Sequence, residues 1–597
     1  MGFYFMSATR GDSRKPGSYF QLERVYTGPN IHSSDPVVRV SWNNGFLKKR
    51  SFFESLSVMM EASASWVELL DTDAELDPSD VALAVGTFLT NWSWKILNAE
   101  RGFVKSHGSQ RDGERVISWI GYHDPTLSLQ VLDHAAESIR RLSFDQDWAT
   151  WFARSTASIL KICRVKHPDY QAKFLMQAAD ALNIPYFAVP SMPRCWQYGW
   201  GRRGALSFET GIAENSYLFH QTARNKPETK AFLRSLGFPV ARDCVVRSQA
   251  GLSRARRRVG FPCVTKPVDG KQSRNVTVGI TSPDQLLKGF EEAWQFSRGR
   301  VLIEQMLQGD VHRLMVVRGE YLCSVRRVPA SVIGDGISTI EALLDEKESN
   351  RLADPAKALY GYAVPRNDEM KKRLAKRSLS LDSVLPENFE YHLFDLPRTS
   401  LGSTLTDVTN ITHRDVKQMA MAIAEAMRLQ CIGIDYISRD ISLPPTSTCG
   451  FLEVNSVPSI QIPLVAGIKH EKCVKAILGQ RAGRIPSTLK IVSGDEFKAH
   501  KQPEEKQHGE GWVWGQTCGI GPMKLVPKTA STFECARTLL MNPRVQRIDI
   551  VTSVDDLVKN GLPLDYFDHI AFPDGSTTIP PDWQALLQQM MGGTADR

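Results

Sequence analysis

Apolar and polar residues alternate along the chain in patterns that predict a mixed α/β protein. Period-two alternation in short apolar runs predicts strands, whereas apolar residues three and four positions apart predict helices. Residues 240–330 alternate the two patterns several times. The elements that matter most below are helices predicted at 226–236 and 415–429, a buried strand at 185–189, and strands at 431–437 and 450–457.

The chain has 597 residues, more than one hydrophobic core usually serves, so we expect several domains. Nine of the thirteen tryptophans precede residue 201, which gives the first part apolar bulk for its own core. Residues 345–395 are polar and predict a long excursion or small subdomain. The predicted domains are an N-terminal domain (1–165), a connecting segment (166–220), a central domain (221–480), a Lys-rich linker (481–510) and a small α/β C-terminal domain (511–597).

Composition narrows the class of protein. Apolar residues make up 42% and charged residues 23%, as in ordinary globular proteins. No run of about 18 apolar residues is present, and the N-terminus lacks the apolar core of a secretory signal, so we expect a cytoplasmic protein without membrane association. The ten cysteines form no C-x-x-C pair, which favours reduced thiols over zinc ligands.

The net charge of +8 is modest, and it is densest in a run of four arginines: Arg254, Arg256, Arg257 and Arg258. Such a run can bind nucleic acid, but no nucleic-acid motif accompanies it, so a solvated face is the preferred interpretation. A small anionic substrate explains the positive bias. We therefore expect small-molecule partners and no nucleic acid.

The strongest chemical signal lies in the last two strands of the central domain. Residues two apart share a face of a strand, so Glu453 and Asn455 project together. Asp435 lies in the preceding strand. Two carboxylates and an amide oxygen are the hard ligands that Mg²⁺ prefers. Each strand alone is explained better by ordinary surface residues. The two strands together favour a metal site, because a strand that contains a lysine and a strand that breaks at a glutamate precede them in the chain, as described next.

Upstream, the apolar run 261–267 contains Lys266. An unpaired buried ammonium is costly, so this lysine needs an anionic partner, which triphosphate oxygens can supply. The loop at 269–276 lies where a phosphate-covering flap is expected, with backbone N–H groups turned to the anion. The apolar strand at 301–307 breaks at Glu304, a candidate hinge at the edge of an adenine. A core strand with a terminal glutamate explains Glu304 equally well.

The order of seven polar residues resembles the ATP-grasp superfamily: Lys226, Lys266, Glu304, Arg313, Asp435, Glu453 and Asn455. Three stretches resemble the ATP-grasp module of cyanophycin synthetases, at 309–317, 327–340 and 433–455. The second is the most specific. Weaker similarity at 24–31 and 178–239 extends the resemblance over about two thirds of the chain. It implies an ATP-grasp fold with a cyanophycin-synthetase-like N-terminal domain.

The resemblance also implies a reaction. The γ-phosphate of ATP passes to a carboxylate, and an amine then displaces phosphate to form an amide, with ATP and Mg²⁺ as cofactors. Asp435, Glu453 and Asn455 would hold the metal, and Arg313, with Arg327 as a second candidate, would act on the transferring group or fix a carboxylate. A homodimer or homotetramer is expected.

The remaining site residues also follow from the resemblance. Those that would bind ATP are Lys226, Lys266, Gly270, Ser273, Arg274, Glu304, Gln305 and Leu307. Those that would face the substrate are Arg398, Ser400, Gly402 and His312. For His312 a structural role is the preferred interpretation.

The sequence departs from the family pattern in three places. Ser273 and Asn275 stand where the family's flap has glycines, and Gln272 where it has a histidine. The loop at 398–404 differs from the family's substrate loop, which suggests a different substrate with an extra acidic group facing Arg398. Ser459 follows Pro458, where the family has a glycine.

Cyanophycin synthetases continue into a second ligase of the Mur type. Residues 536–543 and 561–570 resemble fragments of that module, but its phosphate loop is missing, because 515–521 lacks the Lys-Ser/Thr pair. We therefore predict that 511–597 is a degenerate Mur-ligase-like remnant. With one active site, the chain is expected to perform a single ligation that joins an amino acid or short peptide to an amine.

Two alternatives remain open. One is a polymer synthase subunit that works with a separate Mur-type partner. The other is a nucleotide-binding pseudoenzyme with a scaffold role, which the glycine-poor flap favours and the intact set of Asp435, Glu453 and Asn455 opposes.

Overall fold

The computed structural model describes residues 19–43, 79–99, 101–142, 147–190, 192, 194–270, 275–353, 361–493, 497, 506–525, 531–572 and 578–591. The chain divides into two compact units, one made of Met1–Leu206 with Arg481–Arg597 and the other of Ser207–Gln480. The predicted α/β class is confirmed. Within the ranges given above, no helix is long and apolar enough to cross a membrane.

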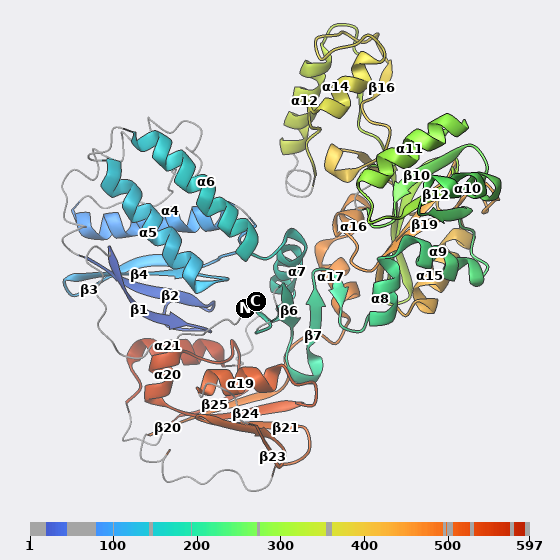
Figure 1. Cartoon of the computed structure of the whole chain (residues 1–597). Helices are drawn as coiled ribbons and strands as arrows, with labels where there is room; N and C mark the ends of the chain where they lie inside the picture. The colour runs from blue at the N-terminus through green and yellow to red at the C-terminus, as the bar shows by residue number, and fades with distance from the viewer. Residues whose placement is uncertain are drawn as a thin grey trace. The chain divides into compact units, whose positions relative to one another are not determined.

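The N-terminal part of the first unit is an antiparallel sheet with helices on one face (Figure 1). Its strands, in spatial order, are β1 (Phe20–Tyr26), β2 (Val37–Trp42), β4 (Arg115–Gly121) and β3 (His107–Asp112). The helices are α4 (Val81–Ala99), α5 (Pro125–Leu142) and α6 (Trp148–Lys166). Trp92, Trp148 and Phe152 lie in the buried cluster that joins these elements. The tryptophan-rich segment thus has a core of its own.

The connecting segment holds α7 (Tyr170–Ala181), β5 (Tyr186–Ala188), β6 (Cys195–Tyr198) and the short helix η2 (Gly201–Arg203). The Asp169 carboxylate caps α7 by accepting from the N–H groups of Gln171 and Ala172. The strand predicted at 185–189 forms, but the prediction that it is buried is wrong. Tyr186 and Phe187 are half-buried and Ala188 is exposed, because β5 is the end strand of its sheet and pairs only with β6.

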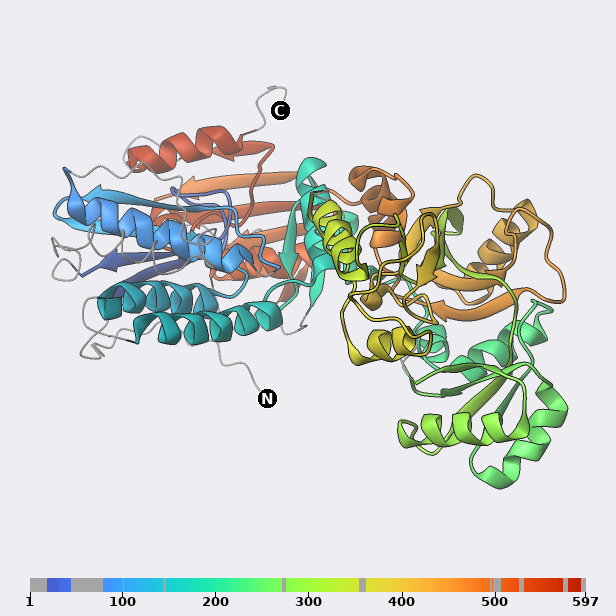
Figure 2. The ribbon, with the colours of Figure 1, turned by 90° about the horizontal axis from the view of Figure 1, so that it is seen from above.

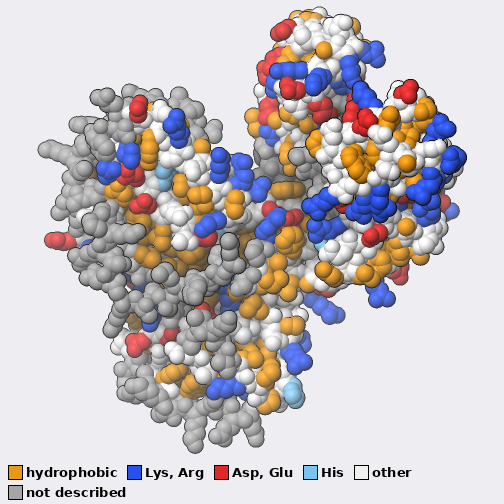
Figure 3. All heavy atoms as spheres, in the orientation of Figure 1, with side chains coloured by type: hydrophobic (Ala, Val, Ile, Leu, Met, Phe, Trp, Pro, Cys, Tyr) orange, Lys and Arg blue, Asp and Glu red, His pale blue; other side chains and the backbone are white. Residues whose placement is uncertain are grey.

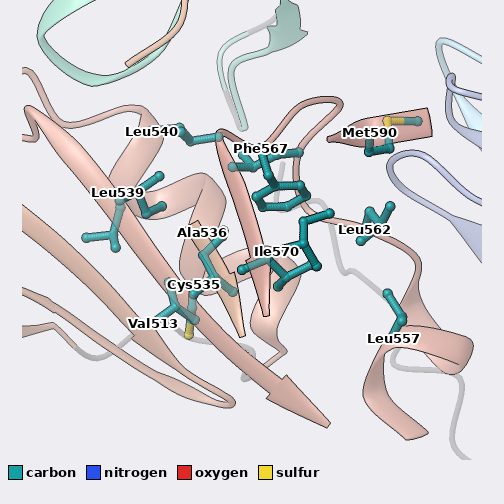
Figure 4. Close-up of a cluster of buried hydrophobic side chains, with 14 of the residues drawn as sticks. Val513, Cys535, Ala536, Leu539, Leu540, Leu557, Leu562, Phe567, Ile570 and Met590 are labelled. Atoms are coloured by element: carbon teal, nitrogen blue, oxygen red, sulfur yellow. The ribbon is translucent and has the colours of Figure 1, made fainter. Parts of the chain in front are cut away.

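In its described residues the C-terminal part of the first unit is a six-stranded sheet with helices packed on it. Its strands, in spatial order, are β23 (Met523–Leu525), β22 (Thr517–Ile520), β21 (Glu510–Trp514), β24 (Arg547–Ser553), β20 (Ser487–Val492) and β25 (His569–Ala571). The helices are α19 (Thr532–Leu540), α20 (Val554–Asn560) and α21 (Pro581–Met590). The β21, β24, β20 and β25 strands are parallel, and side chains such as Leu539, Phe567 and Ile570 build the core (Figure 4).

The linker predicted at 481–510 is wrong for part of its length. Residues 487–492 form β20, which lies between β24 and β25 in the sheet. Leu489 and Ile491 are buried, and the alternation typical of a strand is present in the sequence. The lysine-rich run that follows masked this signal. The glycine-rich stretch 515–521 lies in and around the hairpin formed by β21 and β22.

The N-terminal and C-terminal segments of the first unit lie side by side (Figure 1 and Figure 2, blue and red), and one buried cluster contains residues of both. Tyr26, Val37 and Trp200 belong to the buried cluster of the C-terminal sheet. The Leu562 N–H donates to the Pro29 carbonyl over 2.8 Å. The N-terminal motif at 24–31 therefore contacts the C-terminal stretch 561–570.

In its described residues the second unit contains two larger antiparallel sheets, and the strands β15 (Ser331–Ile333) and β16 (Glu390–His392), described below, pair as a small third one. The first has, in spatial order, β11 (Thr277–Ile280), β10 (Cys263–Pro267), β12 (Val301–Gln305) and β9 (Asp243–Val246). Its helices are α10 (Leu252–Val259) and α11 (Pro283–Gln295), after the short helix η3 (Gln249–Gly251). Only Ala255 and Val259 of α10 are buried, so its four arginines lie on a solvated face, as preferred from the sequence.

The second sheet has, in spatial order, β17 (Thr404–Asp407), β14 (Glu320–Val328), β13 (Asp310–Val317), β18 (Cys431–Ser438) and β19 (Gly450–Asn455). The apolar face of α15 (Arg414–Ala426) packs on it through Val416, Ala420 and Ile423. The other helices of this unit are α8 (Tyr217–Ala223), α9 (Lys226–Ser235), α16 (Gln461–Val465) and α17 (His470–Leu478), and β7 (Ala205–Phe208) pairs with β8 (Gly211–Ile212).

The polar segment expected at 345–395 forms a small subdomain, drawn in yellow in Figure 1. Its elements are β15 (Ser331–Ile333), α12 (Ile340–Ala353), α14 (Asp368–Ala375), β16 (Glu390–His392) and the short helix η4 (Thr399–Leu401). It has its own core, which includes Ile340, Leu344, Met370 and Phe394. The subdomain begins before residue 345, because β15 and α12 belong to this core.

Candidate active site

Polar side chains meet where β13, β18 and β19 run side by side. In the register of these strands Arg313 lies opposite Asp435, Asp435 lies opposite Glu453, and Gly433 lies opposite Asn455. Paired residues of neighbouring antiparallel strands share a face, so the structure brings the predicted metal ligands together. The intervening residues belong to the core that α15 covers: Leu314, Ile434 and Val454.

Two arginines hold Asp435. The Nε of Arg313 donates to Oδ1 over 2.6 Å and its Nη2 donates to Oδ2 over 3.2 Å, while Nη1 of Arg327 lies 3.7 Å from Oδ1. Burial raises the pKa of Asp435, against the lowering effect of the two guanidinium groups. Burial, with repulsion from Arg313, lowers the pKa of Arg327 to about 10. Among the described residues the Nε of Arg327 is buried and has no hydrogen-bond partner, so we regard it as a donor for an anion.

Glu453 is half-buried, and cations around it favour its ionised form. Nδ2 of Asn455 donates to its Oε1 over 3.3 Å, and Nζ of Lys226 lies 3.7 Å from Oε2. Burial raises the pKa of Glu453, but Lys226 and neighbouring cations outweigh burial and lower it to about 2. Lys226 also donates to the Gly270 carbonyl over 2.8 Å, so one ammonium links α9, the start of the flap loop and β19.

Glu304 lies between two lysines. One carboxylate oxygen accepts from Lys266 of β10 and the other from Lys230 of α9. Burial raises the pKa of Glu304, but Lys230 and Lys266 lower it to about 2. The structure therefore supplies a carboxylate of the chain itself as an anionic partner of Lys266, and the role of the segment at Glu304 as a hinge at the edge of an adenine stays a prediction.

Sequence reasoning missed Lys230. A signal was present, because Lys230 is four residues after Lys226 and three before Leu233, so it shares the buried side of the predicted helix.

The segment after Glu304 joins the two sheets. The Gln305 N–H donates to the Arg242 carbonyl over 2.8 Å, and its side-chain oxygen accepts from Arg242 Nε over 3.2 Å. Leu307 is buried, and the Gln308 N–H donates to the Thr448 carbonyl over 3.3 Å. The predicted hinge therefore spans from the first sheet to the loop before β19.

Part of the predicted flap lies outside the described residues, including Ser273 and Arg274. Gly270 precedes this stretch. Asn275 follows it with a φ of 56°, a left-handed conformation that asparagine tolerates better than most residues. Asparagine therefore meets the backbone geometry of a position where the family has glycine.

His312 does not join the site. It precedes Arg313 in β13 and so points to the opposite face of the sheet. Burial lowers its pKa to about 4. The structure thus agrees with the structural role preferred for His312 and contradicts a substrate contact.

The residues of the expected substrate loop lie in and beside η4. Arg398 forms an ion pair with Glu369 of α14, and its Nε is buried without a hydrogen-bond partner. Ser400 is exposed, and Gly402 has a φ of 72° and packs against Val364. Across the described part of the chain, Arg398 makes its ion pair with Glu369 and none with the network around Asp435.

The donor set at β18 and β19 fits Mg²⁺. In the described ranges no three His, Cys, Asp or Glu side chains are grouped to hold a metal, so an ion here would rely on two carboxylates and the Asn455 amide oxygen. The network has two more cations than carboxylates, which suits a polyphosphate. The cations are Lys226, Lys230, Lys266, Arg313 and Arg327; the carboxylates are Glu304, Asp435 and Glu453. Lys and Arg side chains also gather on the face of this unit seen in Figure 3.

Comparison with known proteins gives relatives for part of the chain. No family model matches it. It is 29% identical to cyanophycin synthetase of Synechocystis sp. over 293 residues, which are 48% of this chain and 33% of the relative. It is 28% identical to cyanophycin synthetase of Trichormus variabilis over 407 residues, which are 65% of this chain and 44% of the relative. The chain therefore spans less than half the length of these curated relatives.

Among solved structures, a bifunctional glutathione synthetase from Pasteurella multocida is similar over 56% of this chain and 49% of its own, with 20% identity and a TM-score of 0.40. The sequence similarity to the two cyanophycin synthetases covers about half to two thirds of the chain. On this sequence similarity, the covered part of the chain resembles the cyanophycin synthetases, in agreement with the resemblance that the sequence motifs indicated.

Proposed function

We propose that the chain is an ATP-dependent carboxylate–amine ligase that forms an amide through an acyl phosphate. The γ-phosphoryl group of ATP is transferred to a substrate carboxylate with release of ADP. An amine nitrogen then attacks the acyl carbon and forms the C–N bond. The acyl C–O bond breaks, so inorganic phosphate leaves with one oxygen of the original carboxylate, and the nitrogen loses a proton. The substrates are an amino acid or short peptide and an amine, joined in a single ligation.

One observation carries the proposal. Two carboxylates and an amide lie on one sheet face beside two arginines, and Lys226 links Glu453 to the Gly270 carbonyl, three residues after β10. Lys226 and Lys266 would bind the phosphates, and Asp435, Glu453 and Asn455 would hold Mg²⁺. The bound ion would neutralise charge that develops on the transferring phosphoryl group. The unpaired Nε of Arg327 would donate to the acyl phosphate or to the substrate carboxylate.

The C-terminal domain contributes no second ligase in this proposal. Its glycine-rich stretch is part of a strand hairpin, and a phosphate loop would instead connect a strand to a helix N-terminus. We keep the interpretation of a degenerate Mur-ligase-like remnant. The fragment at 536–543 begins on α19 and the fragment at 561–570 ends in β25, and both contribute to the cluster that also contains N-terminal residues.

The test is a screen of amino-acid pairs with ATP and Mg²⁺ that detects ADP together with a new amide by mass spectrometry. Glu453→Ala should abolish both products, because it removes an ionised metal ligand. Glu291→Ala, on the outer helix α11, is the matched control and should leave both unchanged.

The outcomes separate the alternatives. Turnover by Glu453→Ala at the wild-type rate refutes the metal site. Nucleotide binding without any amide across the screen favours a pseudoenzyme. Extension of a β-aspartyl–arginine primer by one aspartate favours a polymer synthase subunit that needs a Mur-type partner.

A further inference from the structure

The fully buried ammonium of Lys230 is the feature of the second unit that the proposed chemistry leaves unexplained. Its side chain is 0% exposed, whereas that of Lys266 is 12% exposed. Both ammonium groups pair with Glu304, one with each carboxylate oxygen. Lys266 is thus the member of this triad that reaches solvent from β10, and Lys230 lies behind the carboxylate.

A charge count shows what the buried lysine changes. A pair of Lys266 and Glu304 alone is neutral, so a phosphate approaching Lys266 would also meet an uncompensated carboxylate directly behind it. With Lys230 bound to the other oxygen, the triad carries one net positive charge. Because burial weakens solvent screening, this difference acts strongly on an anion at Lys266.

We propose that Lys230 is a positioning residue that neutralises Glu304 and so leaves the charge of Lys266 available to the polyphosphate of a nucleotide. This inference rests on the proposed function, because it assumes that Lys266 binds ATP phosphates. Lys230 acts without touching the nucleotide. Glu304 fixes where the Lys266 ammonium lies, and Lys230 cancels the electrostatic penalty of using a carboxylate for that purpose.

A merely structural role for Lys230 predicts a different pattern of variants. If Lys230 only fills space and completes an ion pair in the core, replacing it should weaken nucleotide binding whether or not Glu304 is also replaced. If it neutralises Glu304, removing the carboxylate charge as well should restore the site, since a buried ion pair can often be replaced by neutral groups without loss of stability.

The experiment measures binding of a non-hydrolysable ATP analogue with Mg²⁺ by isothermal titration calorimetry. Lys230→Met should weaken binding at least tenfold. Lys230→Met with Glu304→Gln should recover to within about threefold of the wild type, while Lys230→Arg keeps the charge and should remain near the wild-type value. Lys347→Met, which removes a part-buried lysine of the subdomain that donates to the Ser331 carbonyl, is the matched control and should bind as the wild type does.

Each result decides between the proposals. Wild-type affinity in Lys230→Met, or equal weakness in the single and double variants, overturns the role of Lys230 and leaves the ligase proposal standing. A wild-type chain that binds no nucleotide overturns both. If Lys230→Met does not fold, the double variant decides, because the inference requires it to bind within about threefold of the wild type and weaker binding refutes it.

Discussion

Replacing Gly433 by alanine tests whether the position of Arg313 sets the activity. A Cβ at residue 433 would lie 2.7 Å from Nη1 and 3.1 Å from Cδ of Arg313, and 3.0 Å from Cβ of Pro458. Real Cβ atoms do not approach as closely as 2.7 Å, so the guanidinium must shift. It then loses its aligned pair of hydrogen bonds to Asp435.

The expected loss of activity can be calculated from the two hydrogen bonds between Arg313 and Asp435. A hydrogen bond between charged groups contributes about 1.5–3 kcal/mol. Loss of one of the two therefore predicts a fall in kcat/KM of about 10- to 100-fold. The assay is ADP release with the substrate pair found in the screen, alongside thermal unfolding to measure stability.

Gly483→Ala is the matched control. A Cβ at residue 483 would lie 2.9 Å from Nη2 of Arg203, a similar conflict with an arginine in the other unit. This variant should keep full activity. Full activity and an unchanged Tm in Gly433→Ala would show that Arg313 does not need its present position, and would refute the reasoning.

Three further predictions concern other residues. Asp435→Asn should lower the free energy of unfolding by about 3–5 kcal/mol in urea titrations, because it leaves buried guanidinium groups without their counter-ion; an unchanged midpoint would contradict the burial of this network. Because the folded pKa of Glu304 lies near 2, below its ordinary value, its carboxylate stabilises the fold above about pH 4.5 and that stabilisation is lost as pH falls toward 2. The difference in unfolding free energy between the wild type and Glu304→Gln should therefore shrink by about 3 kcal/mol across that window, and a constant difference would argue against the pairing. Gly561→Ala adds a Cβ 2.9 Å from the Pro29 carbonyl at a residue with φ of 83°, so it should destabilise the first unit in limited proteolysis while ATP-analogue binding by the second unit stays unchanged.

Local patterns in the sequence were sufficient for the strands that carry the site. The alternation around Asp435 and Glu453 indicated which residues share a face, and the register of β18 and β19 agrees with it. The helices at 226–236 and 415–429 were found within a few residues of α9 and α15. Strands and helices can be predicted in this way because apolar residues repeat every two or every three to four positions, and this spacing is visible in a single sequence.

Pairings across long sequence separations could not be predicted in the same way. Lys230 and Glu304 are 74 residues apart, and Arg313 and Asp435 are 122 apart. A lysine or an aspartate in an apolar context indicates that some partner exists, but only the fold shows whether it is a ligand or another side chain. The strand β20 was missed for a different reason, because the composition of its lysine-rich neighbours outweighed six alternating residues.

The shared core of Tyr26, Val37 and Trp200 with the C-terminal sheet has a consequence for how the chain is made. During synthesis the N-terminal sheet leaves the ribosome long before the strands that bury its exposed apolar edge. The whole ATP-grasp unit is translated in between and has all its own contacts available first. Shortened versions that stop near residue 480 should therefore contain a folded second unit attached to an N-terminal segment that exposes apolar side chains and aggregates. Their solubility should increase when the C-terminal domain is supplied as a separate polypeptide.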